Sequence, residues 1–122
     1  MDVVAIVLEG LLGLMFAMAG IMKIAGAKMH VDNFNHWGLP QWFRVVTGLV
    51  ELVGAAVLVV GIWVPSWAAW GGLLLGLTML AGVAVHLRVR DKAAATMPAV
   101  VLLVLAAAIV AIQSAEFGNF PG

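Results

Sequence analysis

The stretch that decides the fold is FRVVTGLVELVGAAVLVVGIWVPSWAAWGGLLLGLTMLAGVAVHL, residues 43–87, in which only Arg44 and Glu51 carry a full charge. A helix needs about 20 mostly apolar residues to cross a bilayer. The stretch holds two such runs, Phe43–Val64 and Ser66–Leu87, with a very short turn between them at Pro65. We therefore predict two antiparallel membrane helices that pack side by side.

Two further apolar runs flank this pair. Val3–Ile24 is interrupted only by Glu9 and Lys23, and Ala93–Ile112 contains no charged residue. The first run lacks a basic leading segment and is too long for the apolar part of a signal peptide. Because lipid-facing backbone must form its hydrogen bonds within its own segment, each run is predicted to be a helix. The predicted fold is all-α, a single domain over residues 1–122 that forms an integral membrane four-helix bundle, with spans at about 3–24, 43–64, 66–87 and 93–112.

The composition excludes several classes of protein. Of the 122 residues, 65% are hydrophobic and 10% are charged, whereas about 25% of the residues of a soluble domain are charged. The lipid bilayer is therefore the expected partner. The formal net charge is zero, so nothing indicates a nucleic-acid partner. The chain has no cysteine, which excludes disulfides and thiol chemistry on the chain itself.

The basic residues predict the orientation. Basic residues near the ends of spans stay on the cytoplasmic side. All six lie in or beside the first and third loops, and none lies on the other side: Lys23, Lys28, Arg44, Arg88, Arg90 and Lys92. We therefore expect loops 1 and 3 to be cytoplasmic and both termini to lie outside the cytoplasm, in a multi-pass membrane protein.

Glu51 is the first candidate for a functional residue, because it lies near the middle of its span. An acid at that depth usually faces the bundle interior or a water-filled cavity, and many such acids handle protons or bind ligands. Thr47 and Arg44 share its face of the helix, and Thr78 of the third span lies at a similar depth. The alternative is a structural acid that forms hydrogen bonds across helices. Its ionisation in isolation is disfavoured unless a cation or water relieves the charge.

Glu9 is a weaker candidate for the same proton or ligand site. It lies shallower in the first span, roughly 10 Å from the outer edge by helical rise. We expect its side chain to snorkel or to be exposed to water.

A second group of polar residues is expected at the cytoplasmic ends of the spans. Lys23, Arg44 and His86 end three different spans at one level, and His30 and His36 lie nearby in the first loop. They either form an electropositive mouth for an anionic headgroup, a quinone carbonyl or a substrate, with histidine exchanging protons, or they are ordinary anchors. No metal site is expected, because His30 and His36 lack further ligands.

Small residues predict where helices pack closely. Gly72 and Gly76 form a GxxxG pattern in the third span, which suits a close contact inside the bundle. The first loop, Gly26–Leu39, carries apolar residues at a spacing of three, which indicates a short helix in the headgroup zone. The methionines are interpreted as core filler: Met15, Met18, Met22 and Met79.

Two segments resemble a known family. GLMFAMAGIMKIAG (Gly13–Gly26) ends the first span with Gly-x-x-Lys, and GLPQWFRVVTGLVELVGAAVLVVGIWVP (Gly38–Pro65) has a Gly-Leu-Pro entry and a mid-span Glu. The pattern resembles the DoxX-like family of small four-helix bacterial membrane proteins. It covers the first two spans well, the third loosely and the fourth only in hydropathy. Lys23 and Glu51 match the family pattern, whereas His86 has no clear counterpart in it.

The resemblance implies an accessory membrane subunit of a quinone-linked oxidoreductase complex, with a redox partner subunit or a second copy of the chain as its partner. No covalently bound cofactor is expected, and quinone or lipid are the candidate bound molecules. Two alternatives stay open. One is a binder, carrier or isomerase of a lipophilic small molecule, which predicts a cavity beside Glu51 open to lipid. The other is an assembly factor for membrane proteins. The sequence leaves open whether the chain is an enzyme.

Overall fold

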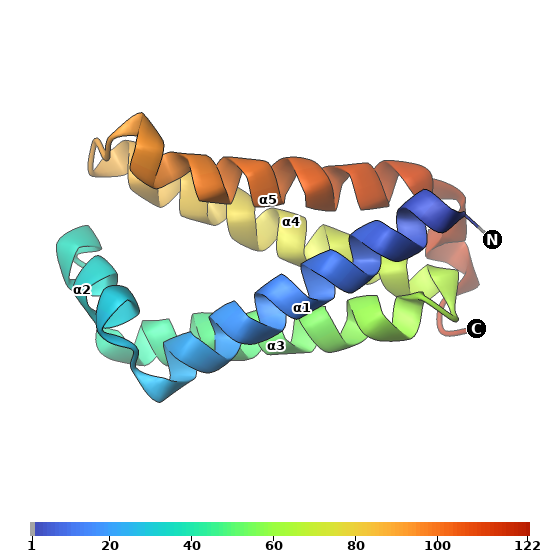
Figure 1. Ribbon diagram of the computed structural model, residues 1–122, viewed down its shortest axis with the longest axis horizontal. Coiled ribbons are helices and arrows are strands. Elements are labelled where there is room, and N and C mark those ends of the chain that lie inside the picture. The colour runs from blue at the N-terminus through green and yellow to red at the C-terminus, as the bar shows by residue number, and fades with distance from the viewer. Residues whose placement is uncertain (1) are drawn as a thin grey trace.

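The computed structural model describes residues 2–122, which form helices and turns with no strand among them (Figure 1). Met1, the first residue of the predicted domain, lies outside the described residues. The elements are α1 (Val3–Ala25), α2 (Lys28–Trp37), α3 (Gln41–Gly61), α4 (Pro65–Arg88), α5 (Ala93–Ile112) and the 3-10 helix η1 (Ser114–Asn119). Helices α1, α3, α4 and α5 are long and apolar enough to cross a membrane. The predicted all-α class is therefore confirmed, and these four helices are candidates for the four predicted membrane spans.

Local sequence sets the ends of the first two helices. The Asp2 carboxylate accepts hydrogen bonds from the backbone N–H groups of Val4 at 2.9 Å and Ala5 at 3.3 Å, which caps the start of α1. Helices α1 and α2 end at Gly26 and Gly38, whose φ angles are 78° and 73°. Glycine adopts this left-handed conformation without strain. The two glycines therefore bracket α2.

Two boundaries refine the prediction from sequence. The second span begins at Gln41, directly after Pro40, and ends at Gly61, so α3 lies slightly earlier in the chain than 43–64. The first loop contains the short helix α2, and its Phe34 is 2% exposed. Helix α2 is therefore packed against the bundle by this side chain.

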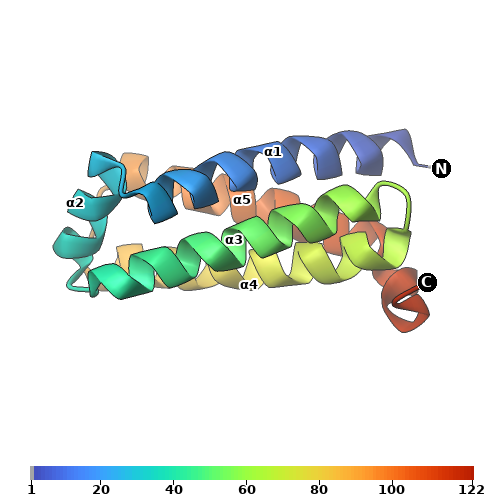
Figure 2. The ribbon, with the colours of Figure 1, turned by 90° about the horizontal axis from the view of Figure 1, so that it is seen from below.

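The long helices form two antiparallel pairs. Helix α1 packs against α3, α4 packs against α5, and contacts between α3 and α4 join the pairs. The pairs lie close together at the end where α1 begins and the chain ends, and they diverge toward the other end, where α2 lies across the bundle (Figures 1 and 2). The bundle is therefore closed at one end and splayed at the other.

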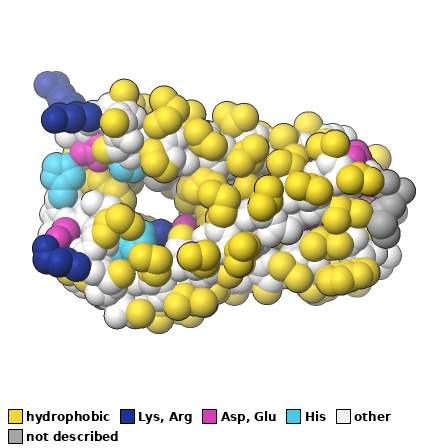
Figure 3. Space-filling view, viewed as in Figure 1, with side chains coloured by type: hydrophobic (Ala, Val, Ile, Leu, Met, Phe, Trp, Pro, Cys, Tyr) yellow, Lys and Arg dark blue, Asp and Glu magenta, His cyan; other side chains and the backbone are white. Residues whose placement is uncertain are grey.

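The apolar core comes from all four long helices. Leu12, Phe16, Leu58, Leu75 and Ile109 are 0% exposed. Large apolar side chains also cover the flank of the molecule (Figure 3). A soluble monomer rarely exposes so large an apolar surface, so this flank is suited to lipid.

The methionines correct one prediction. Met15, Met18 and Met22 are 46%, 57% and 40% exposed and lie on the outer surface of α1, whereas Met79 is 9% exposed. The interpretation as core filler is therefore wrong for the three methionines of α1. Their flexible side chains face the surroundings of the bundle.

The closest approach of α1 and α3 is made by Gly20 and Gly48. A Cβ added to Gly20 would lie 2.7 Å from the Gly48 carbonyl oxygen, and one added to Gly48 would lie 2.8 Å from the Gly20 carbonyl oxygen. The Cβ added to Gly48 would also lie 3.0 Å from the Cβ of Lys23. Only glycine allows backbones to approach this closely. The crossing brings Lys23 and Glu51, each three residues after one of these glycines, onto facing helices.

The GxxxG glycines of α4 face α5. A Cβ added to Gly72 would lie 3.1 Å from Ile109 Cγ2, and one added to Gly76 would lie 3.6 Å from the Ala106 Cβ. The contact at Gly72 is tight and the contact at Gly76 is an ordinary one. The tighter crossing at Gly20 and Gly48 was not predicted from the sequence.

Candidate functional site

A cavity of about 420 Å³ lies between the two helix pairs at the splayed end of the bundle. All five α-helices contribute residues to its lining. Sites for small molecules typically measure about 300–1,000 Å³. Figure 3 shows a hollow on the flank of the molecule between the pairs, with basic, acidic and histidine side chains visible within it. The cavity is therefore large enough for a small ligand, and it opens sideways where the helices face lipid.

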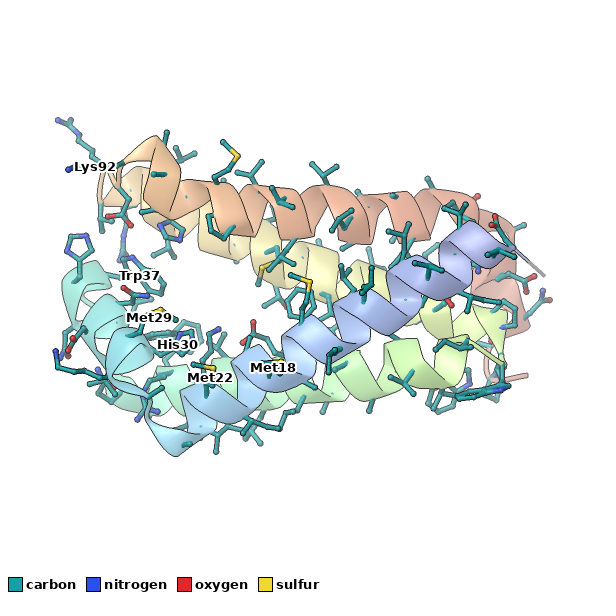
Figure 4. All side chains as sticks on the ribbon, in the orientation of Figure 1. Met18, Met22, Met29, His30, Trp37 and Lys92 are labelled. Carbon is teal, nitrogen blue, oxygen red and sulfur yellow. The ribbon has the colours of Figure 1, made fainter. Side chains whose placement is uncertain are left out.

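The walls are mostly apolar, with a few polar groups. The aromatic rings of Phe34, Trp37 and Phe43 line the α2 and α3 side, and Pro98 and Leu102 line the α5 side. Figure 4 shows Met29, His30 and Trp37 on α2 at the space between the pairs, whereas Lys92 lies at the outer tip of the α4–α5 loop. The polar side chains of the lining include Lys23, His30, Thr47, Glu51, Thr78 and His86. This combination suits an apolar ligand with a polar group.

The central polar feature is an ion pair between Lys23 and Glu51. The Lys23 Nζ lies 2.9 Å from the Glu51 Oε1, and the two side chains are 12% and 1% exposed. Glu51 Oε1 has no partner with good hydrogen-bond geometry, so at this distance the contact is an ion pair rather than an aligned hydrogen bond. A cation thus relieves the buried carboxylate, as its depth in the membrane requires. The cation is Lys23, not Arg44.

The crossing of α1 and α3 produces this pair. Gly48 has no side chain, so the stem of Lys23 passes over α3 at that point. Replacing Gly48 with a larger residue would push against both the Gly20 carbonyl and the Lys23 Cβ. The glycines that let the helices touch therefore also position the ion pair.

His30 lies next to this pair, on α2. Its side chain lines the cavity, and the residue is 8% exposed. Burial lowers the pKa of the His30 imidazole below its ordinary value, and the positive charges of Lys23 and Arg44 lower the pKa further. His30 is therefore neutral at neutral pH and offers one donor and one acceptor nitrogen.

Thr47 and Thr78 line the cavity from α3 and α4. Their hydroxyls donate to carbonyl oxygens of their own helices, from Thr47 to Phe43 at 2.8 Å and from Thr78 to Leu74 at 2.8 Å. Each hydroxyl oxygen keeps its lone pairs available as acceptors. The structure thus brings both predicted threonines to the same cavity as Glu51.

A polar cluster that we call the latch joins α2 to the α4–α5 loop. Asp91 Oδ1 lies 2.7 Å from His36 Nε2, and Asp91 Oδ2 lies 2.6 Å from His86 Nδ1. The Trp37 indole N–H donates to Asp91 Oδ2 at 3.1 Å, and the Arg88 guanidinium donates to the Trp37 carbonyl oxygen. The hydrogen bond with His36, helped by those with His86 and Trp37, holds the pKa of Asp91 below its usual range despite partial desolvation. Asp91 is therefore a carboxylate at neutral pH.

The structure merges the two predicted sites. Lys23, His30 and His86, expected at an inner mouth, line the same cavity as Glu51, Thr47 and Thr78. His36 does not line it, since its side chain is 58% exposed and belongs to the latch. Asp91 was not singled out from the sequence.

Arg44 and Glu9 are corrections to the predicted Glu51 site. Arg44 points away from Glu51, because its guanidinium donates to the backbone oxygen of Lys23 and, at 2.7 Å, to the Gln41 side chain. Glu9 lies near the opposite end of the bundle. It neither snorkels nor reaches water, since it is 1% exposed. Its Oε1 accepts a hydrogen bond from Gln113 at 3.1 Å.

Within residues 2–122, no group of three or more histidine, aspartate or glutamate side chains is placed to hold a metal ion. The polar side chains of the lining are thus a lysine, a carboxylate, two imidazoles, two hydroxyls, the Asn33 amide and the Trp37 indole.

Comparison with known proteins gives two matches. The profile of the DoxX-like family matches residues 7–109, which includes most of α1 and α5 and everything between them. The chain is also similar to a Bacillus subtilis (strain 168) protein described as uncharacterized protein YdgD. The two are 27% identical over 108 residues, which cover 88% of this chain and 95% of that protein. No solved structure matches the chain.

Proposed function

The chain belongs to the DoxX-like family, and from its cavity we propose that it binds a lipophilic small molecule that carries a polar oxygen group. One observation carries the proposal: a buried ion pair, Lys23 with Glu51, faces an apolar cavity that opens between the helix pairs. A purely structural ion pair does not need a cavity beside it. Bundle cores are a common place for such sites.

The chemistry of the walls suggests how a ligand sits. The Lys23 ammonium has three N–H donors, and its contact with Glu51 leaves donors free for a carbonyl or an ionised oxygen of the ligand. The aromatic and aliphatic walls suit a ring or an acyl chain. Quinones and lipids both have this chemistry, so we propose them as the bound class. Entry from the bilayer uses the opening between the pairs.

We also propose the orientation that the basic residues predict. Most of the lysine and arginine atoms visible in Figure 3 gather at the α2 end, and we place that end in the cytoplasm, with both termini outside, in a bacterial inner membrane. The chain lacks cysteine, so single cysteines give clean labelling. Cysteine at Lys28 or Arg90 should be protected from an impermeant maleimide in intact cells, and cysteine at Asn119 should react.

Binding is tested by filling the cavity. Gly82 lines the cavity, and a Cβ added there meets nothing within 4 Å, so Gly82→Phe occupies the space without a backbone clash. A Cβ added to Gly10 also meets nothing within 4 Å, but Gly10 lies in the first half of α1 and does not line the cavity. Gly10→Phe is therefore the matched control. The probe is a decyl-chain benzoquinone, titrated against the protein in detergent and followed by quenching of tryptophan fluorescence.

We expect saturable binding by the wild type and by Gly10→Phe, and loss of binding by Gly82→Phe with unchanged helix content. Equal binding by all three proteins would show that the probe does not occupy the cavity. No saturable binding by the wild type would instead favour the alternative that the chain is an assembly factor for membrane proteins.

A second candidate function follows from the family resemblance: an accessory membrane subunit of a quinone-linked oxidoreductase. Its partner would be a redox subunit or a second copy of the chain. Crosslinking in native membranes followed by gentle purification tests it. Recovery of a quinone-reducing activity with the tagged chain would support this role, and recovery of the chain alone, as a monomer, would contradict it.

A further inference from the structure

His86 lines the cavity on the α4 side, and Asp91, which is not part of the lining, holds the Nδ1 of His86. We propose that His86, held by Asp91, is a hydrogen-bond acceptor inside the cavity, and that the ligand it recognises carries a hydroxyl group on an apolar body, as a lipophilic phenol does. The inference rests on the proposed function, because it assumes that the cavity binds a ligand.

Asp91 decides which nitrogen of His86 carries the proton. A carboxylate only accepts hydrogen bonds, so the nitrogen that lies 2.6 Å from Asp91 Oδ2, His86 Nδ1, must be the donor. In a neutral imidazole the other nitrogen then has a lone pair and no proton. His86 Nε2 is therefore the acceptor when the imidazole is neutral.

The latch also fixes the direction of the ring. The rings of His86 and Trp37 meet edge to face, with centroids 5.1 Å apart and an interplanar angle of 76°. Trp37 is itself held by its hydrogen bond to Asp91 Oδ2 at 3.1 Å. Turning the His86 ring would break its bond to Asp91 and its packing on Trp37. The acceptor nitrogen is thus held in one orientation before any ligand binds.

The cavity leaves this nitrogen available. The His86 side chain is 12% exposed and lines the cavity, and Nε2 makes no hydrogen bond within residues 2–122. Besides His86, the titratable side chains that line the cavity are Lys23, Glu51 and His30. Glu51 Oε1 pairs with the Lys23 ammonium at 2.9 Å. The Thr47 and Thr78 hydroxyls offer oxygen acceptors. His86 Nε2 is the ring nitrogen that Asp91 and Trp37 hold in one orientation. A ligand hydroxyl is the group that satisfies it.

The test uses two ligands that share one apolar body and differ at the polar oxygen, which is a hydroxyl in one and a methyl ether in the other. 4-Octylphenol and 4-octylanisole have the same apolar body, but the methyl ether cannot donate a hydrogen bond. The wild type should bind the phenol roughly tenfold more tightly, as expected for one hydrogen bond to a buried acceptor. His86→Phe keeps a ring against Trp37 but has no nitrogen, and it should bind the two ligands equally. Gly10→Phe should keep the tenfold preference.

Variants of Asp91 test whether this residue orients the His86 imidazole or only stabilises the fold. In Asp91→Asn the Trp37 N–H still needs an acceptor, so the amide oxygen should take the place of Oδ2 and continue to accept from His86 Nδ1. The amide nitrogen then faces His36. Asp91→Asn should therefore keep the preference for the phenol, whereas Asp91→Leu should lose it.

The outcomes are distinguishable. If neither ligand shows saturable binding to the wild type, the proposed function fails. If the wild type binds both ligands equally, or binds the ether more tightly, the role of His86 is overturned while ligand binding stands. If Asp91→Leu keeps the preference, Asp91 does not set the tautomer of His86. These comparisons are ratios of two affinities of one protein, so a modest loss of stability in a variant does not disturb them.

Discussion

Lys23→Met is the substitution that most directly probes the buried ion pair. It removes the ammonium that lies 2.9 Å from the Glu51 carboxylate, which is 1% exposed. The carboxylate must then stay charged without a partner or take up a proton. A carboxyl group with an ordinary pKa of about 4.3 costs about 3.7 kcal/mol to protonate at pH 7. Breaking a buried pair typically costs about 3–5 kcal/mol, so we expect the free energy of unfolding to fall by about 3–4 kcal/mol.

Companion variants show whether the two residues act as a pair. Glu51→Leu leaves the ammonium of Lys23, which is 12% exposed and can reach the cavity, so we expect a smaller loss of stability than for Lys23→Met. In the double variant Lys23→Met/Glu51→Leu neither charge remains, and stability should return to within about 1 kcal/mol of the wild type. The matched control is Lys28→Met, whose 91% exposed side chain pairs with Asp32 at 3.0 Å and should contribute less than about 1 kcal/mol.

The assay is reversible unfolding in mixed micelles of dodecyl maltoside and SDS, followed by far-UV circular dichroism. The reasoning is refuted if Lys23→Met costs less than about 1 kcal/mol, the value for an exposed pair. It is equally refuted if the losses of the two single variants simply add in the double variant, because that would mean that the two charges do not interact.

Three further predictions follow from the packing and the charges. Gly48→Ala should lower the free energy of unfolding by about 1–3 kcal/mol, because its Cβ would lie 2.8 Å from the Gly20 carbonyl oxygen; Gly10→Ala, with nothing within 4 Å, should be tolerated in the same unfolding assay. Gly76→Leu should destabilise the packing of α4 on α5 and lower the thermal midpoint, and an unchanged midpoint would show that this position tolerates bulk. The pKa of the His30 imidazole is lowered from 6.5 in the folded state, so the unfolded chain binds more protons below that pH, and the free energy of unfolding should fall as the pH drops below about 6.5. His30→Phe should flatten this pH dependence. An unchanged profile in this variant would contradict the burial of a neutral imidazole.

The sequence predicts the spans well because lipid imposes one strong requirement on them. In lipid, an apolar run of the right length must be a helix, because its backbone N–H and C=O groups must form hydrogen bonds within the same segment. Hydropathy therefore predicts α1, α3, α4 and α5. The short helix α2 follows from the spacing of Phe34 and its apolar neighbours. Helix α3 begins before the apolar run because Pro40 sets the helix start, as the position of this proline in the sequence indicates.

The site is less predictable because it depends on which helices cross and where. Lys23 and Glu51 were both singled out, but they were assigned to separate sites at different depths. The crossing at Gly20 and Gly48 lets the Lys23 stem reach across. The parallel spacings Gly-x-x-Lys and Gly-x-x-Glu are a signal that could have suggested the pairing.

The sequence analysis placed Glu9 wrongly and did not single out Asp91, because the surroundings of both residues depend on contacts between distant segments. The depth of Glu9 was inferred from helical rise alone, whereas its burial depends on Gln113 just after α5. Asp91 lies among basic residues in a loop and resembles an ordinary loop acid. Its role appears only when α2 brings His36 and Trp37 beside it.

The most direct test of the central claim is photolabelling of the protein in native membranes. The probe is a lipophilic diazirine-bearing benzoquinone, and labelled residues are identified by mass spectrometry of peptides. Labelling should concentrate at cavity-lining positions of three helices, Ala19, Gly82 and Leu102, and excess unlabelled decyl benzoquinone should abolish it. Labelling spread over lipid-facing positions such as Leu14 and Val104, which are 60% and 59% exposed, and unaffected by the competitor would contradict a ligand site in the cavity.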